Sequence, residues 1–140
     1  MRSLVEVLSG TALDGTVPPK IMNVLRLDAW SRSDYFVRKV ADFEVVWGLF
    51  NTGWATASTG ATTAVPFWPE DEFAALCATA EWQGFQPKAI ALEDFLARWL
   101  PGMEKDQRIC LVFSTPTDRG SLLHPKDLDS LIRQELQQYE

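Results

Sequence analysis

Residues 44–68, EVVWGLFNTGWATASTGATTAVPFW, decide the fold, because they contain three apolar runs separated by two short turns. The turns, NTG at 51–53 and TG at 59–60, are typical of reversals between antiparallel strands. The runs are rich in the β-branched and aromatic residues that strands prefer. The stretch therefore predicts a three-stranded antiparallel meander. Its first run is apolar on both alternating faces, so we expect it to be the most central strand.

A helix is predicted directly after the meander, where FWPEDEF at 67–73 combines aromatics, a proline and three carboxylates. Pro69 suits the first helical position, and the acids then fall in the first turn, where the helix dipole favours negative charge. Apolar residues follow at i, i+3, i+4 and i+7, which gives one buried stripe on a helix ending near Gly84. The stripe consists of Phe73, Leu76, Cys77 and Ala80.

Helical spacing also appears before the meander, in SRSDYFVRKVADF at 31–43, where Ser31 and Asp34 fit a capping box. After the helix that follows Pro69, FQPKAIAL at 85–92 predicts a short strand. The next segment, LEDFLARWL at 92–100, predicts a helix that ends at Pro101-Gly102.

The last quarter of the chain predicts a strand, a turn and a final helix. RICLVFS at 108–114 is a continuous apolar run, and TPTDRGS at 115–121 has the composition of a turn. The closing segment HPKDLDSLIRQELQQYE at 124–140 places Pro125 at the first helical position. Its expected buried face consists of Leu128, Leu131, Ile132, Leu136 and Tyr139.

These elements predict an α+β fold with a largely antiparallel sheet, made of the meander plus one or two later strands and covered by about four helices. Residues 22–140 are expected to form a single domain. The first 21 residues show no trustworthy helix or strand period and are interpreted as a tail. We hypothesise that Met22 is the natural start and the preceding segment an upstream extension, which an intact-mass measurement on natively expressed protein would test.

Composition narrows the possible partners. The 140 residues are 46% hydrophobic and carry 13 basic against 19 acidic side chains, for a net charge of −6. This balance, without a basic patch, disfavours binding to nucleic acid or to an anionic membrane surface. No apolar run approaches the roughly 18 residues of a membrane span, and no secretory signal is apparent, so we predict a cytoplasmic protein. Cys77 and Cys110 lie within apolar patterns and are expected to be buried free thiols.

The chain lacks a recognisable catalytic set. Its only histidine, His124, directly precedes Pro125, where a capping or solvent-facing role is expected, and no phosphate-binding glycine pattern is present. Its clustered carboxylates fall at predicted helix starts, where the helix dipole accounts for them. We therefore predict no cofactor and no metal, although converging carboxylates are a minor alternative.

Six tryptophans exceed ordinary usage and require an explanation. Trp47 and Trp99 lie on strongly apolar elements and are expected to pack in the core. The other candidates, Trp54, Trp68 and Trp82, stand at strand or helix ends, where an amphipathic ring is more often half exposed and available for recognition. Together with Asp71 and Glu72 these three form the candidate binding residues.

The order of landmarks resembles a known bacterial family, the domain of unknown function 2750. The likeness extends over about residues 32–140 and rests on VWGLF…GWA, VPFWPEDEFAALCA, WQGFQPKAIALEDFLARWLPGM, LVFSTP and the closing HPKDLDSLIRQELQQYE. The resemblance implies a small, stand-alone, soluble α+β protein. It implies no activity, cofactor or catalytic residue, because the family has none agreed.

The leading functional hypothesis is a non-catalytic protein-interaction module, an adaptor or an immunity-type inhibitor. Its acidic surface suits a basic protein partner, which it would bind through a sheet edge or through the aromatic rim around Trp54, Trp68 and Trp82. The alternative is a small-ligand binder with a pocket between the meander and the helix after Pro69. An enzyme is the least favoured hypothesis. The only catalysis we can name for it is general acid or base catalysis by Asp71, Glu72 or Glu93.

Overall fold

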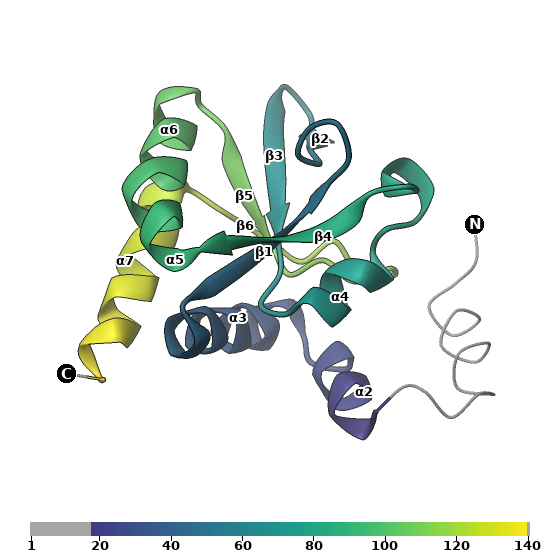
Figure 1. The fold of residues 1–140 in the computed structure, drawn as a ribbon, viewed down its shortest axis with the longest axis horizontal. Helices are drawn as coiled ribbons and strands as arrows, with labels where there is room; N and C mark the ends of the chain where they lie inside the picture. Colours follow the sequence, from purple (N-terminus) through teal and green to yellow (C-terminus); the bar gives the residue numbers. More distant parts are fainter. Residues whose placement is uncertain (1–17, 140) are drawn as a thin grey trace.

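The computed structural model describes residues 18–139 and has an α+β architecture, as predicted (Figure 1). Its helices are α2 (Pro19–Leu25), α3 (Ala29–Phe43), α4 (Asp71–Leu76), α5 (Leu92–Asp94), α6 (Leu100–Lys105) and α7 (Pro125–Gln137). Its strands are β1 (Val45–Phe50), β2 (Ala57–Thr59), β3 (Thr62–Phe67), β4 (Gln86–Ala91), β5 (Ile109–Val112) and β6 (Ser121–Leu123). There are also two short helical turns, the 3₁₀ turn η1 (Ala80–Trp82) and the π turn η2 (Phe95–Trp99).

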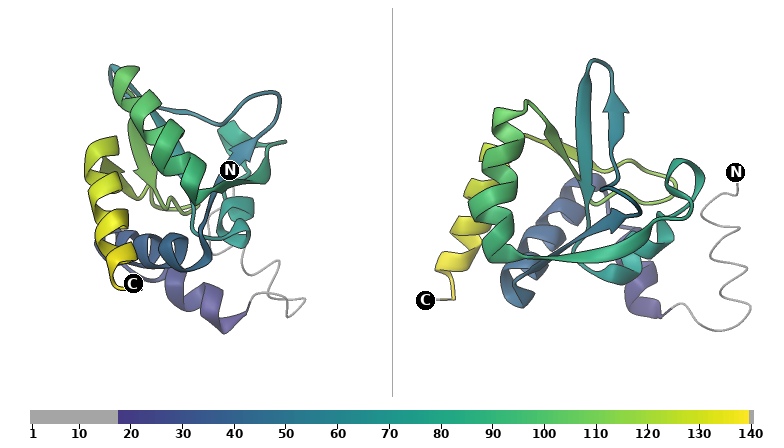
Figure 2. Two further views of the ribbon diagram at one scale, coloured as in Figure 1. Left: turned by 60° about the vertical axis from the view of Figure 1, so that its left-hand side comes forward. Right: turned by 45° about the horizontal axis from the view of Figure 1, so that its top comes forward.

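The strands form a four-stranded sheet of order β2-β3-β5-β6 and a separate β1-β4 pair. All neighbours are antiparallel except β3 and β5, which run parallel with Ala64 opposite Ile109. A single bridge between Trp47 and Trp68 joins β1 to the end of β3. At one end of the molecule α7 lies beside the α5–α6 segment, as both views of Figure 2 show. None of the helices between residues 18 and 139 has the length and apolar content that a bilayer crossing requires.

The predicted meander is correct only in its second half. The β2–β3 hairpin forms, but β1 pairs with β4 rather than with β2 and is not the central strand. The reason lies at Gly48, because the Trp54 ring covers it so closely that a Cβ there would be 2.9 Å from the ring. After the turn at 51–53 the chain therefore folds over the face of β1, touching its edge only at the bridge between Phe50 and Trp54.

Two helix starts differ from the prediction. In α3 the N-cap is Asp28, whose side chain accepts a hydrogen bond from the Ser31 amide, so Ser31 lies inside the helix rather than at its cap. In α4 the N-cap is Glu70, which places Pro69 before the helix. The carboxylate of Glu70 does not cap the helix but accepts bonds from the Tyr35 hydroxyl at 2.7 Å and from Lys20 at 3.0 Å.

Two helix ends also differ. Helix α4 ends at Leu76 rather than near Gly84, and η1 follows as a separate turn, so Ala80 is exposed instead of continuing the buried stripe. The helix that starts at Leu92 passes through Pro101 and ends at Lys105. Turn η2 ends at Trp99, two residues before that proline, and a local π turn is one way in which a helix accommodates a residue that breaks its regular bonding.

The core lies between the sheets and the helices and contains large side chains from every layer. On α7 the buried residues are Pro125, Leu128 and Ile132, whereas Leu131 and Tyr139 are exposed, contrary to prediction. Residues 1–17 lie outside the described part. The predicted domain boundary at residue 21 falls inside α2, and Ile21 packs in the core.

Candidate functional site

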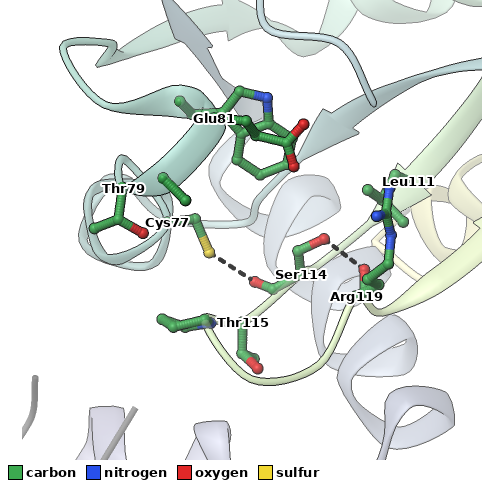
Figure 3. A pocket seen from close by; sticks show the side chains of 10 residues that line it. Cys77, Thr79, Glu81, Leu111, Ser114, Thr115 and Arg119 are labelled. Carbon is green, nitrogen blue, oxygen red and sulfur yellow. Dashed lines mark hydrogen bonds between the residues drawn. The ribbon is translucent and has the colours of Figure 1, made fainter. Parts of the chain in front are cut away.

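A pocket of about 200 Å³ lies where the parallel strands β3 and β5 end. Because parallel strands place their carboxyl ends at one edge, the segments that follow them meet there, as in other sheets that bind ligands at this edge. We call this cavity the sheet-end pocket. One wall is the chain from the end of α4 through η1, and the other is the loop 113–120 after β5 (Figure 3). Its lining includes Cys77, Glu81, Trp82, Leu111, Ser114 and Arg119.

A buried arginine holds the base of loop 113–120. Arg32, on α3, is only 2% exposed. Its Nε donates to the Phe113 carbonyl at 3.2 Å, its Nη1 to the Leu27 carbonyl at 2.6 Å, and its Nη2 to Asp118 Oδ2 at 2.5 Å. A buried guanidinium is tolerated when all its donors find partners, so these bonds fix the loop at both ends of its turn.

The first part of the loop is also held by side chains from outside it. The Ser114 carbonyl accepts the Trp68 indole N–H at 2.9 Å and the Cys77 thiol at 3.3 Å. The Ser114 hydroxyl donates to the Arg119 carbonyl, which closes the turn on itself (Figure 3). Trp68, directly after β3, and Cys77, directly after α4, therefore share one carbonyl of the loop, and the pocket walls are tied together.

The backbone around the pocket adopts conformations that L residues rarely use. Phe113 has φ 59° and Ala80 has φ 52°, although neither is glycine. Gly120 has φ 86°, and a Cβ there would clash with the Val112 carbonyl oxygen, so only glycine fits. Such strained positions persist only where the surrounding structure enforces them, and they cluster at functional sites.

Burial disfavours the thiolate form of the cysteine in the pocket. Burial raises the pKa of Cys77 to about 12 and that of Cys110 likewise to about 12, so both are protonated. Both are free, as predicted. His124 is exposed at the N-cap of α7. Between residues 18 and 139 no three His, Cys, Asp or Glu side chains are placed to hold a metal ion together.

The structure buries two of the three candidate tryptophans, contrary to the expectation that they are half exposed. Trp68 is 0% exposed and Trp82 8%. Each indole N–H finds an internal carbonyl, since Trp82 donates to Thr56 at 3.0 Å, and the two rings meet edge to face at 5.9 Å. Both amphipathic rings are thus satisfied inside, and of the two only Trp82 reaches the sheet-end pocket.

The remaining predicted site residues do not join these rings. Trp54 is partly buried and packs edge to face against Trp99 at 4.7 Å, so the three candidate tryptophans do not form one exposed rim. Asp71 and Glu72 are exposed in the first turn of α4, where the helix dipole accounts for them. Their role in binding stays a prediction.

Sequence reasoning missed a second surface, the groove between α3 and α7. This groove, which we call the α3–α7 seam, has a volume of about 250 Å³. Trp30 stands on it with 78% of its surface exposed, and Leu131 is exposed beside it. The signal available in the sequence was the i, i+4, i+7 spacing of the α3 residues that line the seam. A more apolar stripe on the same helix, which is buried, lies beside these residues and made the signal hard to see. The lining residues are Trp30, Ser33, Asp34, Val37, Leu131, Gln134, Glu135 and Gln138.

Comparison with known proteins identifies one family. A family model described as "Protein of unknown function (DUF2750)" matches residues 33–132, which is more than half of the chain. The match includes β1 to β6, the whole sheet-end pocket and most of α3 and α7. No curated protein and no solved structure matches the chain.

Proposed function

The chain belongs to the family of proteins of unknown function DUF2750, and we propose that it is a non-catalytic protein-interaction module, an adaptor or an immunity-type inhibitor, with a basic partner. The observation that carries this proposal is the exposure of Trp30 on the α3–α7 seam. The tryptophan-rim surface expected from the sequence has less support, because Trp68 and Trp82 are buried.

Trp30 has the features of a binding anchor. Tryptophan is among the residues most enriched at the energetic centres of protein interfaces, because a large rigid ring excludes water at little entropic loss. At 78% exposure the ring contributes little to the core of its own chain. Leu131, 41% exposed, and the buried Val37 extend the apolar surface along the groove.

The charged groups of the seam determine the chemistry of the partner. Among the described residues that line it, the ionisable ones are Asp34 and Glu135, both acidic. Asp34 forms a surface pair with Arg38 at 3.1 Å, a contact of small energy that a partner can replace. A lysine or arginine would meet a carboxylate and the face of an indole in the same groove, which is the arrangement that cation–π recognition uses. The net charge of −6 further favours approach of a basic protein.

The chemistry of the sheet-end pocket supports a role without catalysis. Its thiol is held protonated by burial, and its carbonyl and hydroxyl groups are largely occupied by bonds within the chain. A general base or nucleophile would need a pKa near neutral pH.

The test begins with affinity capture from a lysate of the source cell and continues with the captured protein in purified form. Binding by wild type and by Trp30→Ala is compared by calorimetry, with Phe43→Ala as control, since Phe43 is an exposed aromatic on the same helix that does not line the seam. We expect Trp30→Ala to weaken binding by at least about 30-fold, which corresponds to about 2 kcal/mol, and Phe43→Ala by less than about threefold.

Salt dependence and charge reversal complete the test. We expect affinity to fall as ionic strength rises and to fall further in Glu135→Lys, because the proposed contact is between a basic partner and an acidic groove. If a purified partner binds wild type and Trp30→Ala equally well, the seam is not the binding surface. If the partner is acidic, the proposed charge complementarity is wrong.

A further inference from the structure

We propose that the sheet-end pocket binds a free α-amino acid with an uncharged side chain, with Arg119 at the ligand carboxylate and Glu81 at its ammonium group. This site is separate from the α3–α7 seam, so it stands or falls independently of the proposed function. The inference rests on the size of the pocket, on the two opposite charges in its walls and on the backbone that holds them.

The size of the pocket limits the ligand. Its volume of about 200 Å³ is below the roughly 300–1,000 Å³ of sites for drug-sized molecules and cofactors. A nucleotide or a dinucleotide cofactor is therefore too large. A single amino acid is of the right order, and it carries two charged groups on a small frame.

The two charges come from opposite walls and lack ionic partners among the described residues. Glu81 belongs to η1 and Arg119 to the loop after β5, and Figure 3 shows both side chains at the pocket. Among residues 18–139 neither takes part in an ion pair. In the same part of the chain the Arg119 guanidinium donates only to the Ser58 carbonyl at 3.5 Å, which is too long to hold it strongly.

The backbone beside each of the two charged residues is constrained. Glu81 directly follows Ala80, held at φ 52°, and Arg119 directly precedes Gly120, held at φ 86°. The Ser114 hydroxyl, in turn, donates to the Arg119 carbonyl. A constrained backbone loses little entropy when a ligand binds, so only the two side chains have to become ordered.

The presence of both signs selects a zwitterion. A simple carboxylate would be attracted by Arg119 but repelled by Glu81. A simple amine, which is protonated, would be attracted by Glu81 but repelled by Arg119. An α-amino acid satisfies both. Its side chain would lie on the apolar part of the lining, Leu111, Trp82 and Pro116, which favours an uncharged and mainly apolar group.

The test measures the melting temperature of the full chain with each standard L-amino acid at about 10 mM, followed by calorimetry on those that stabilise it. At least one apolar amino acid should raise Tm by about 2 °C or more. The N-acetyl derivative and the carboxamide of that amino acid should each bind at least about tenfold more weakly, because each removes one of the two charges.

Variants assign the charges to the residues. Arg119→Gln and Glu81→Gln should each weaken the amino acid at least about tenfold, and Glu81→Gln should not weaken the N-acetyl derivative further. Arg108→Gln and Glu93→Gln remove exposed charges outside the pocket and should leave the affinity within about twofold. The proposal is overturned if no amino acid raises Tm, if both blocked derivatives bind as well as the parent, or if the control variants weaken binding as much as the pocket variants.

Discussion

Loop 113–120 and the α3–α7 seam use the same kinds of side chain in opposite ways. The loop buries a tryptophan, Trp68, and an arginine, Arg32, and gives each of them carbonyl partners. The seam leaves Trp30 largely exposed, and Arg38 beside it forms a surface pair with the seam residue Asp34 on the same helix. One region is built from satisfied polar groups, and the other leaves its groups available.

This difference separates residues that shape the molecule from residues that can bind something else. A buried side chain with a full set of partners contributes to folding, and its removal leaves those partners unsatisfied. An exposed aromatic contributes little to folding, so its removal reports on binding. Pairs of matched substitutions, one in each region, test whether the two regions differ as described.

The largest difference is expected between the tryptophans. Trp68→Ala should lower the free energy of unfolding by about 4 kcal/mol, since it opens a cavity and leaves the Ser114 carbonyl without its indole donor. Trp30→Ala should lower it by less than about 1 kcal/mol. Urea unfolding of both variants checks this, and similar losses would show that Trp30 is a folding residue.

The arginines should differ next. Arg32→Met keeps much of the apolar stem but leaves the buried Phe113 carbonyl unpaired and removes the bond to the Leu27 carbonyl, and we expect a loss of about 3 kcal/mol. Arg38→Met removes an exposed pair with Asp34 and should cost at most about 0.5 kcal/mol. The same denaturation measurement applies. A small loss for Arg32→Met would mean that the loop keeps its shape without the guanidinium.

Two glycines with positive φ provide a third comparison. Gly120→Ala should lose about 2 kcal/mol or more, because the added Cβ meets the Val112 carbonyl as well as an unfavourable conformation. Gly60 has φ 67° in the β2–β3 turn, and a Cβ added there would have no atom of the described residues within 4 Å, so Gly60→Ala should lose only about 1 kcal/mol. Thermal unfolding of both variants distinguishes the clash from the conformational effect.

The smallest effect concerns pH. The hydrogen bond from Arg32 holds the pKa of Asp118 below its ordinary value of 3.8, with bonds from the Gly120 and Arg119 amides acting in the same direction. A carboxyl whose folded pKa is depressed adds stability above its unfolded pKa and loses it as the pH falls through the folded value. Asp118→Asn should therefore flatten the decline of stability below about pH 4. If the free energy of unfolding falls with pH in the same way for wild type and Asp118→Asn, the Arg32–Asp118 pair contributes nothing to stability.

Local signals in the sequence predicted a large part of the fold. Pro125 at the start of α7, the apolar run of β5 and the β2–β3 turn each act over a few residues, and each was placed correctly. The partner of β1 was wrong, because pairing depends on segments far apart in the chain. The position of Trp54 over Gly48, which turns the chain away from β1, has no signature in the spacing.

The candidate site was less predictable for the same reason. Trp82 lines the sheet-end pocket, but Glu81 lies on a segment that was expected to be helix and Arg119 on one expected to be a turn, and neither pattern indicates that the two meet. Arg32 lies within a segment predicted as helix, and its burial follows only from carbonyls that the fold brings to it. Charge and spacing in the sequence identify candidate site residues, whereas the groups that each side chain contacts are known only from the tertiary structure.

The parallel alignment of Ala64 with Ile109 also bears on the order in which the molecule assembles. The β2–β3 hairpin closes over a two-residue turn and is available early, whereas β3 can meet β5 only after a long intervening segment has been gathered in. Strand β5 is an interior strand of the sheet. The β3–β5 pairing in the middle of the sheet is therefore completed after the β2–β3 pairing at its edge. We therefore expect refolding to be slow for a chain of this length, with the hairpin protected from hydrogen exchange before β5.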